Sequence, residues 1–404
     1  MDDESFGQAL RRLRGNLSQR ALARLAHCGK SYIGDLETGR RHPSPEMAAL
    51  LDRVLDADGY LIHRAMATAT ADVLERAAAL QRGLGEHLAA GPMSDAGVED
   101  WEYTVARHGQ ATRYQSERRL LGELVDDFAA LQPLLSPRRR HSPSVRRRLT
   151  VVAARLSGLM ALTLLKAGEP TARAWWRTGR QFAGAADDRS TLSWIYAQEA
   201  YQQYYSGDLY GAVELGNRAR MLAGGLPCVG PALAAPLQAR AYAALHQADE
   251  TAAALAEAQS ALDRLDPAER AASAFGYSES QLRFHGGNAW THLGETGRAR
   301  EEHARALELY PASELTDRAF VGLDQAVCLA SDGDTAAAAA HAVATLTALP
   351  DAHRGALIVY RARELAATVP RTRQTLPEVR ELHEVLALPA GGDGEDADRP
   401  GNGT

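Results

Sequence analysis

Cysteine is scarce in this 404-residue sequence, which has three cysteines far apart along the chain. Cys28, Cys228 and Cys328 form no CxxC pair, have no histidine at zinc-ligand spacing and are odd in number. This pattern argues against a disulfide framework and against a zinc site. We therefore expect a protein of the reducing cytoplasm that carries no metal and no other cofactor.

Lysine is rarer still, because Lys30 and Lys166 are the only two in the chain. The other cations are arginines, a bias typical of GC-rich genomes, so an arginine cluster is weaker evidence for function here than elsewhere. Long uninterrupted apolar runs are also missing, and the acidic N-terminus lacks the apolar region of a signal peptide. Neither a secretion signal nor a membrane span is expected, and we predict a soluble protein.

Aromatic residues make up 6% of the chain, whereas 45% of the residues are hydrophobic and alanine is frequent. Small apolar side chains suit closely packed helices better than a β-sandwich or a barrel, so the predicted fold class is all-α. A chain of this length exceeds one ordinary hydrophobic core, and two or more units are expected.

Changes in periodicity and composition divide the sequence into four parts. Residues 1–68 contain short amphipathic segments typical of a compact helical domain. Residues 69–149 are predicted to be a helical linker region, with a hinge in the glycine-containing stretch near 81–100. Residues 150–385 carry repeats, and the Gly- and Asp-rich residues 386–404 are predicted to be a disordered tail.

Turn signals recur along the third part at similar intervals, each between two apolar helical stretches. This pattern predicts helical hairpins that bury their faces against one another. The clearest unit, residues 280–311, resembles the tetratricopeptide repeat, with small residues, Trp290 and Pro311 at that family's intervals. The resemblance implies a degenerate tetratricopeptide-like solenoid. The turn positions taken as equivalent are Gly168, Gly207, Ala248, Gly294 and Gly333, with spacings of 39, 41, 46 and 39 residues.

Residues 17–51 contain the most specific motif of the chain. A Ser-Gln pair and a Leu-Ala pair precede a turn, which is followed by an apolar anchor, Glu-x-Gly and Arg-x-Pro. This order and spacing resembles the helix-turn-helix of the XRE/lambda-repressor family, which implies double-stranded DNA as a partner. The matching residues are Ser18, Gln19, Leu22, Ala23, Ile33, Glu37, Gly39, Arg41 and Pro43.

The second helix of this motif has two sides, as a recognition helix requires. Ile33 and Leu36 fit the side that docks on the domain, and Lys30, Ser31 and Asp35 lie away from it. The polar side chains can donate to guanine or accept from cytosine in the major groove, although Asp35 could instead cap or pair with an arginine.

The family resemblance adds further DNA-contacting positions. It implies that Gln19 contacts phosphate and braces the recognition helix, and that Thr38, Arg40 and Arg41 contact the DNA backbone. Tyr32, on the recognition helix, completes the predicted DNA-binding set. Between residues 11 and 41 eight cations face two acids, a local charge of +6 in a chain of net charge −6. A binder of a polyanion needs such a concentration of positive charge.

Several positions depart from the family pattern. His27 stands where glycine is usual in the turn, and Gly29 stands where Ser or Thr usually caps the recognition helix. Gly34, within that helix, costs about 1 kcal/mol relative to alanine and could permit close helix packing or close approach to DNA. Glu37 fits a structural bond better than a base contact, and Cys28 fits a small core residue better than a redox-sensing thiol.

Two further clusters have alternative interpretations. Six arginines within 138–148 fit a solvated surface, or less well a second phosphate-contacting patch. Nine aromatic residues lie between 175 and 210 and either fill repeat interfaces or line a groove for an apolar ligand or peptide. Arg173 and Arg177, one turn apart, could then bind a carboxylate. The predicted ligand-binding residues are Arg173, Trp176, Arg177, Trp194, Tyr201, Tyr204 and Tyr205.

Catalytic motifs are missing from the sequence: it has no GxSxG, no HExxH and no phosphate-binding loop with lysine. We therefore expect no enzyme. The arrangement resembles actinobacterial regulators with a helix-turn-helix and helical repeats, some of which respond to peptides or small signals. The resemblance implies a cytoplasmic, dimeric, ligand-controlled transcriptional regulator. The alternative is a protein-interaction scaffold whose repeats recruit a partner and whose small domain is a tether.

Overall fold

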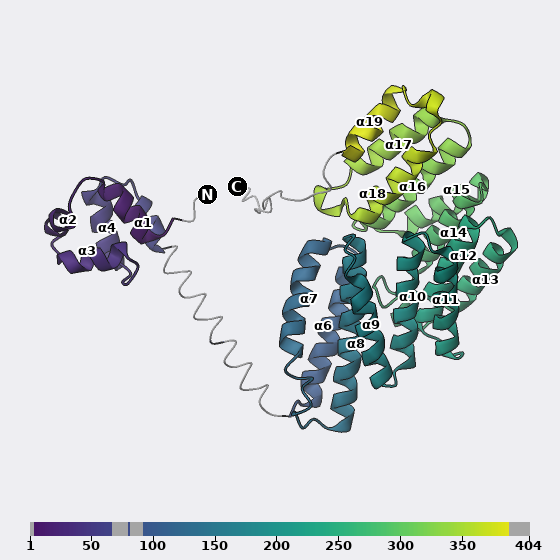
Figure 1. Ribbon diagram of the computed structural model, residues 1–404, viewed down its shortest axis with the longest axis horizontal. Coiled ribbons are helices and arrows are strands. Elements are labelled where there is room, and N and C mark those ends of the chain that lie inside the picture. Colours follow the sequence, from purple (N-terminus) through teal and green to yellow (C-terminus); the bar gives the residue numbers. More distant parts are fainter. Residues whose placement is uncertain (1–3, 67–79, 81–91, 388–404) are drawn as a thin grey trace. The chain divides into compact units, whose positions relative to one another are not determined.

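The computed structural model describes residues 4–66, 80 and 92–387, and every regular element in these ranges is a helix. The predicted all-α fold class is therefore confirmed. The chain divides into two compact units, Met1–Gly91 and Pro92–Thr404, which are described separately below (Figure 1). The predicted tail beyond residue 387 lies outside the described residues.

The first unit packs short helices around one small core. Serine caps begin three of them: the side chains of Ser5, Ser18 and Ser44 each accept a hydrogen bond from a backbone amide of the first turn. A further helical segment covers residues 60–66. The core side chains Leu10, Leu22, Ile33, Leu36, Leu51 and Leu61 are at most 1% exposed. The helices are α1 (Phe6–Arg14), α2 (Gln19–Leu25), α3 (Lys30–Glu37) and α4 (Pro45–Val54).

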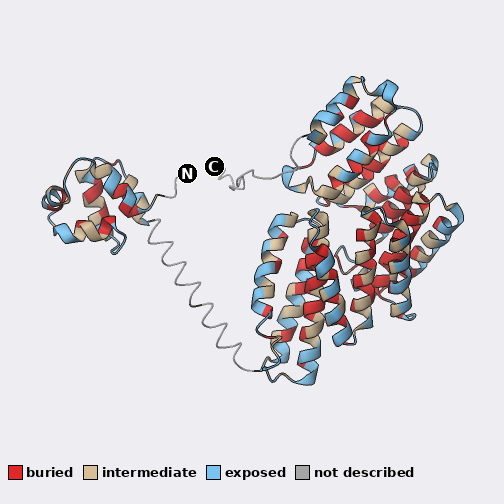
Figure 2. Ribbon diagram, in the orientation of Figure 1, coloured by how far each residue is buried: buried red, intermediate tan, exposed pale blue. Residues whose placement is uncertain are grey.

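The second unit is a row of helical hairpins in a repeat-like arrangement. Buried residues lie along the faces where the helices meet (Figure 2). Its helices are α6 (Asp95–Ala111), α7 (Glu117–Leu131), α8 (Pro143–Lys166), α9 (Ala172–Ala185), α10 (Arg189–Tyr205), α11 (Leu209–Ala223), α12 (Val229–Ala244), α13 (Ala248–Asp263), α14 (Glu279–His292), α15 (Thr296–Leu309), α16 (Leu315–Ser331), α17 (Thr335–Thr347), α18 (Ala356–Thr368) and α19 (Pro377–Ala387).

Each hairpin pairs an even-numbered helix with the next helix in the chain, from α8 with α9 to α16 with α17. The even-numbered helices also contact one another, so that α10, α12, α14, α16 and α18 form one layer of the stack. Their partners form a second layer. This stacking buries faces that a single hairpin would leave exposed, as the repeated turns predicted.

The turns between the paired helices need a residue with positive φ after the helix end. Glycine provides it in four hairpins, with φ from 76° to 91° at Gly168, Gly207, Gly294 and Gly333. In the remaining hairpin this position is His246, with φ 59°, and not Ala248, the position expected from the sequence. Ala248 begins helix α13 instead. With His246 in place, the spacings become 39, 39, 48 and 39 residues.

The longest interval contains a connection that is missing from the other hairpins. Residues 264–278 link α13 to α14 and include a 3-10 turn, Pro267–Arg270. The Ala274 amide donates to the Gly109 carbonyl of α6 at 2.8 Å, and the Ala274 carbonyl accepts from the Trp194 indole of α10 at 2.7 Å. The connection therefore ties helices that are far apart in sequence.

The structure draws two predicted boundaries differently. Helix α6 begins at Asp95, where Ser94 caps it, so the second half of the predicted hinge is helical and residues 81–91 lie outside the described part. Helix α8 begins at Pro143 and runs through the predicted boundary at residue 150. Helices α6 and α7 pack against α8 and thus belong to the second unit, because their apolar faces are buried on it.

Candidate nucleic-acid interface

Helix α3 is held on the first unit by the side that was predicted to dock. Ile33 is fully buried and Leu36 is 1% exposed, and both belong to the core of this unit. Lys30 and Ser31, in the first turn of α3, are exposed, and Tyr32 and Asp35 are half-buried. The geometry leaves a polar edge on α3 that side-chain docking does not use, as a major-groove helix requires.

Glu37, at the end of α3, is a buried acid that joins three helices. It accepts hydrogen bonds from Arg14 Nε of α1 at 2.5 Å and from Gln19 Nε2 of α2 at 2.7 Å, and Arg11 Nε lies 3.8 Å away. Burial alone would raise the pKa of Glu37, but the hydrogen bonds from Arg14 and Gln19 lower it below its usual value. Glu37 thus has a structural role, and Gln19 braces the recognition helix through it.

Helix α1 approaches the end of α3 at a glycine. A Cβ added at Gly7 would lie 2.5 Å from the Leu36 carbonyl oxygen and 2.8 Å from that of Glu37. These are backbone atoms that cannot turn away, so a side chain at position 7 would push the two helices apart. Gly7 therefore sets the distance between α1 and α3.

The family departures have distinct structural outcomes. His27 adopts φ 48° in the turn before α3, a conformation that glycine reaches with less strain. Gly29 is the N-cap of α3 and supplies no side-chain hydrogen bond. A Cβ on Gly34 would meet only the Gln19 side chain, at 3.9 Å, so close helix packing does not explain this glycine. Burial raises the pKa of the half-buried Cys28, the opposite of what a reactive thiol needs.

The predicted backbone-contacting residues follow the end of α3. Thr38 donates its hydroxyl to the Gly34 carbonyl at 2.8 Å, which occupies the hydrogen that a phosphate contact would use. Arg40 and Arg41 are exposed, and the Arg41 guanidinium carbon lies 5.7 Å from the centre of the Tyr32 ring. This cation–π contact holds Arg41 beside the recognition helix.

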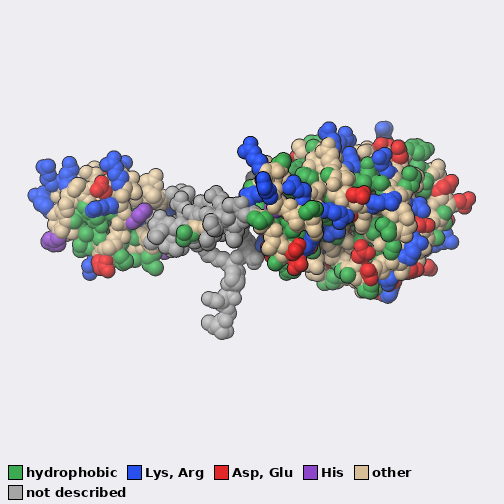
Figure 3. All heavy atoms as spheres, turned by 90° about the horizontal axis from the view of Figure 1, so that it is seen from below, with side chains coloured by type: hydrophobic (Ala, Val, Ile, Leu, Met, Phe, Trp, Pro, Cys, Tyr) green, Lys and Arg blue, Asp and Glu red, His purple; other side chains and the backbone are tan. Residues whose placement is uncertain are grey.

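Positive charge gathers along one edge of the first unit (Figure 3). Two of the eight cations counted between residues 11 and 41 are taken up within the unit, because Arg12 pairs with Glu4 at 2.9 Å and Arg14 pairs with Glu37, whereas Arg11 lies 3.8 Å from Glu37 but stays 61% exposed. The rest are exposed and available to a polyanion. They are Arg11, Arg20, Arg24, Lys30, Arg40 and Arg41.

Three of the six arginines within 138–148, namely Arg146, Arg147 and Arg148, form side-chain bonds inside the second unit. Arg147 Nε donates to the Ala186 carbonyl at 2.8 Å, and Arg148 pairs with Glu102 at 2.7 Å. Arg146 donates to the Arg139 carbonyl at 2.9 Å. For these three arginines the contacts favour a structural role, whereas Arg138 and Arg140 are exposed.

The predicted ligand-binding residues do not form one surface. Trp176 is fully buried and Trp194 is 3% exposed, and both serve the core, whereas Arg173 and Arg177 lie exposed on the other side of α9. Arg173, Trp176 and Arg177 lie within one helical turn or so of one another, but the sequence did not show which face of α9 is buried.

Tyr201, Tyr204 and Tyr205 do lie together. Tyr201 and Tyr205 line a cavity, and the Tyr204 ring centre lies 4.5 Å from the guanidinium carbon of Arg240 beside it. The sequence analysis missed the charged and polar residues of this cavity, which come from distant helices. The one local signal was Arg240 itself, a lone charge in the otherwise uncharged α12 segment. The missed residues are Arg113, Lys166, Arg240, His285 and Tyr310.

Two features of the described residues bear on other classes of function. Across the described residues, no group of three or more His, Cys, Asp or Glu side chains could hold a metal ion. Helix α8 has the length and apolar composition of a membrane span, but 61% of its most apolar window is buried in the second unit. It packs against α6, α7, α9 and α10, which is the environment of a core helix.

Comparison with known proteins agrees with the geometry of the first unit. Residues 5–65 match a family described as "Helix-turn-helix domain". No curated protein and no solved structure matches the chain. The all-helical chain therefore carries an N-terminal helix-turn-helix domain, followed by helices in a repeat-like arrangement.

Proposed function

We propose that this chain is a sequence-specific transcriptional regulator of the XRE type that binds double-stranded DNA through α3. The observation that carries the proposal is the geometry of this helix. Ile33 and Leu36 are buried, whereas Lys30 and Ser31 stay exposed within a surface of exposed cations. Such a helix can enter the major groove while arginines beside it neutralise phosphates.

The second unit is proposed to be a tetratricopeptide-like sensor and dimerisation domain, and the protein is proposed to act in the cytoplasm as a homodimer. Two recognition helices about 34 Å apart would read a pseudopalindrome. A peptide or small molecule that binds one packing of the hairpins better than another would shift that spacing. The alternative scaffold function predicts no preference among DNA sequences, so a specificity ratio near one would favour it.

Replacing both Arg40 and Arg41 by alanine is expected to weaken binding to every DNA sequence. The slope of log affinity against log salt is negative, and each lost phosphate contact reduces its magnitude by about 0.9, so the slope should become less steep by nearly two. Titrations of duplexes at several salt concentrations measure it. Arg53→Ala, outside the 11–41 cluster, serves as the control. An unchanged slope in the double variant would remove these arginines from the interface.

Replacing Lys30 or Ser31 by alanine is expected to change which sequence is preferred. Loss of one base contact should reduce discrimination at one position by about 1–3 kcal/mol. Selection of bound fragments from a genomic DNA library, followed by competition, measures the preference. Arg24→Ala, an exposed cation of α2, should lower affinity and keep the preference. If the α3 variants lose affinity equally for all sequences, these residues are not base readers.

A further inference from the structure

A cavity of about 120 Å³ lies within the second unit, between helices of successive hairpins. Helices α8, α10, α12, α14 and α16 contribute to its wall, and residues 273–276 of the long connection close part of it. The volume is close to that of engineered cavities that hold a single benzene ring. It can therefore hold a small molecule of about one ring.

Arg240 is the unusual member of the wall, because its charge is buried without an acid. The residue is 3% exposed, and among the described residues no carboxylate oxygen lies within 4.0 Å of it. Its Nε donates to Asn288 Oδ1 at 2.7 Å, and the rings of Tyr204, Tyr205 and Phe284 lie 4.5 to 5.7 Å from the guanidinium carbon. Rings and amides do not neutralise a buried cation, so the site favours an anion.

A second buried arginine shows the usual arrangement. Arg361, 7% exposed, donates Nε to Asp324 Oδ1 at 2.8 Å, and Asp324 is itself 1% exposed. Asn288 donates to the other oxygen of Asp324 at 2.8 Å. Asp324 is thus paired with Arg361. In this network Arg240 donates only to the neutral amide oxygen of Asn288.

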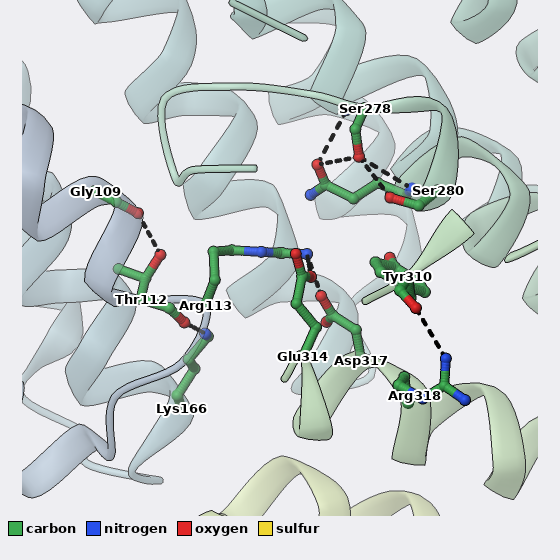
Figure 4. A network of polar contacts seen from close by, with 11 residues as sticks. Gly109, Thr112, Arg113, Lys166, Ser278, Ser280, Tyr310, Glu314, Asp317 and Arg318 are labelled. Atoms are coloured by element: carbon green, nitrogen blue, oxygen red, sulfur yellow. Dashed lines mark hydrogen bonds and ion pairs between the residues drawn. The ribbon is translucent and has the colours of Figure 1, made fainter. Parts of the chain in front are cut away.

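The rest of the wall is also positive. Arg113 donates to Glu314 at 2.5 Å and to Asp317, and Lys166 donates to the Thr112 carbonyl at 2.9 Å (Figure 4). Of these groups Arg113, Lys166 and Asp317 line the cavity together with Arg240. With Glu314, which also pairs with Arg113, this makes three cations against two acids. An anion that enters meets a net positive wall at low solvent exposure.

Two buried polar atoms of the wall have no hydrogen-bond partner among the described residues, Arg113 Nε and the hydroxyl of Tyr310. His285 is different, because its ring nitrogens contact the hydroxyls of Tyr277 at 2.9 Å and Tyr201 at 3.3 Å. Burial, with Arg240 and Arg113 nearby, lowers the pKa of His285 well below its usual value, so the ring is neutral. The donors left for a ligand therefore include those of Arg240, Arg113, Tyr310 and Lys166, whose ammonium uses one hydrogen on the Thr112 carbonyl.

We propose that this cavity binds a small organic anion consisting of one ring and a carboxylate, with the carboxylate paired to Arg240. A planar guanidinium binds a carboxylate through two parallel hydrogen bonds, and the side chains of Tyr201, Tyr205, Phe284 and Phe320 provide the apolar wall for the ring. The inference deepens the ligand control proposed above and rests on it for its regulatory meaning alone. Because the wall comes from successive hairpins, an occupant stabilises one packing of them.

The test uses the full chain and two matched pairs of probes, benzoate with benzamide and phenylacetate with phenylacetamide. Thermal unfolding and calorimetric titration are measured at constant ionic strength, with chloride and inorganic phosphate as further probes. At least one carboxylate should raise Tm and bind roughly tenfold to a hundredfold more tightly than its amide. Equal effects of acid and amide, equal effects of the inorganic anions, or no effect of any carboxylate at millimolar concentration would overturn the proposal.

Arg240→Gln should abolish the preference for the acid. Arg218→Gln is the matched control, because Arg218 packs over the Tyr196 ring at 4.9 Å and does not line the cavity. A preference retained in Arg240→Gln would contradict the inference, and if this variant does not fold, the wild-type comparison of acid with amide decides. If wild-type protein selects DNA but binds no carboxylate, only the proposed anion site is overturned. If it binds a carboxylate but shows no DNA selectivity, only the proposed regulatory function is overturned.

Discussion

Replacing Asp324 by asparagine is expected to lower the free energy of unfolding of the second unit by about 3 kcal/mol, because Arg361 loses its buried partner and keeps only the partly exposed Glu364, 3.1 Å away. Asp324 is 1% exposed and accepts from Arg361 Nε at 2.8 Å and Nη2 at 2.5 Å. The substitution keeps the volume of the side chain and removes only its charge. The loss is therefore electrostatic and not a cavity effect.

Tryptophan fluorescence during urea unfolding measures this effect selectively, because all five tryptophans lie in the second unit. Asp332→Asn is the matched control: Asp332 follows the same helix, α16, and pairs with Arg300 at the surface. Exposed pairs contribute little, so the control should unfold close to wild type. Equal midpoints for the two variants would show that the buried pair does not support the fold.

The pH dependence of this pair has a defined sign. Burial alone would raise the pKa of Asp324, but Arg361 holds it below its ordinary value of 3.8. A carboxylate with a lowered folded-state pKa contributes stability above its unfolded pKa and loses it as pH falls through the folded value. Wild-type protein should therefore lose this contribution below about pH 4, and Asp324→Asn should lack that part of the acid dependence.

Replacing Glu37 by glutamine is expected to destabilise the helix-turn-helix domain by about 2–3 kcal/mol, because the charged partner of Arg14 is lost within a nearly dry contact. The Glu37 side chain is 1% exposed and that of Arg14 is 17% exposed. A domain of about 60 residues has only about 3–9 kcal/mol of stability in total. A large part of the domain stability therefore depends on this acid, and DNA affinity should fall with it.

Hydrogen exchange of backbone amides in residues 5–65 measures the domain directly, since this region contains no tryptophan. Protection in α1, α2 and α3 should decrease together, because Glu37 joins all three helices. Glu46→Gln is the control, with an exposed glutamate in the first turn of α4. Unchanged protection in Glu37→Gln, or loss confined to α3, would argue against a shared role for Glu37.

The sequence predicted the helix-turn-helix well because each of its signals is local. Ile33 and Leu36 are confirmed as docking residues, and two further motif positions have local roles: Ser18 caps α2, and Gly39 adopts φ 73° after α3. Each depends on neighbours within one helical turn or one short loop. The link from Glu37 to Arg14 was outside the reach of this reasoning. It joins residues 23 positions apart, and only the packing of α1 on α3 brings them together.

The second unit shows where periodicity is insufficient. Glycines revealed four of the five turns. At the fifth, His246 adopts the same left-handed conformation, and a histidine does not signal such a turn in the sequence. On α9 the sequence could not tell which of Trp175 and Trp176 faces the core, because both sides of the helix carry large residues. The environment of Arg240 is formed by Asn288 and by tyrosines of other helices, and no spacing within α12 predicts these contacts.

The long connection between α13 and α14 adds residues to the cavity wall without changing the order of the stacked helices. Three intervals between hairpin turns measure 39 residues, and the interval that contains residues 264–278 measures 48. This extra length contributes Ser273, Ala274 and Gly276 to the cavity wall while the helices keep their order. A change of sequence in this one connection that keeps the backbone bonds of Ala274 can therefore alter which molecule fits and leave the hairpin frame intact. Ligand choice and fold are in this sense independently adjustable.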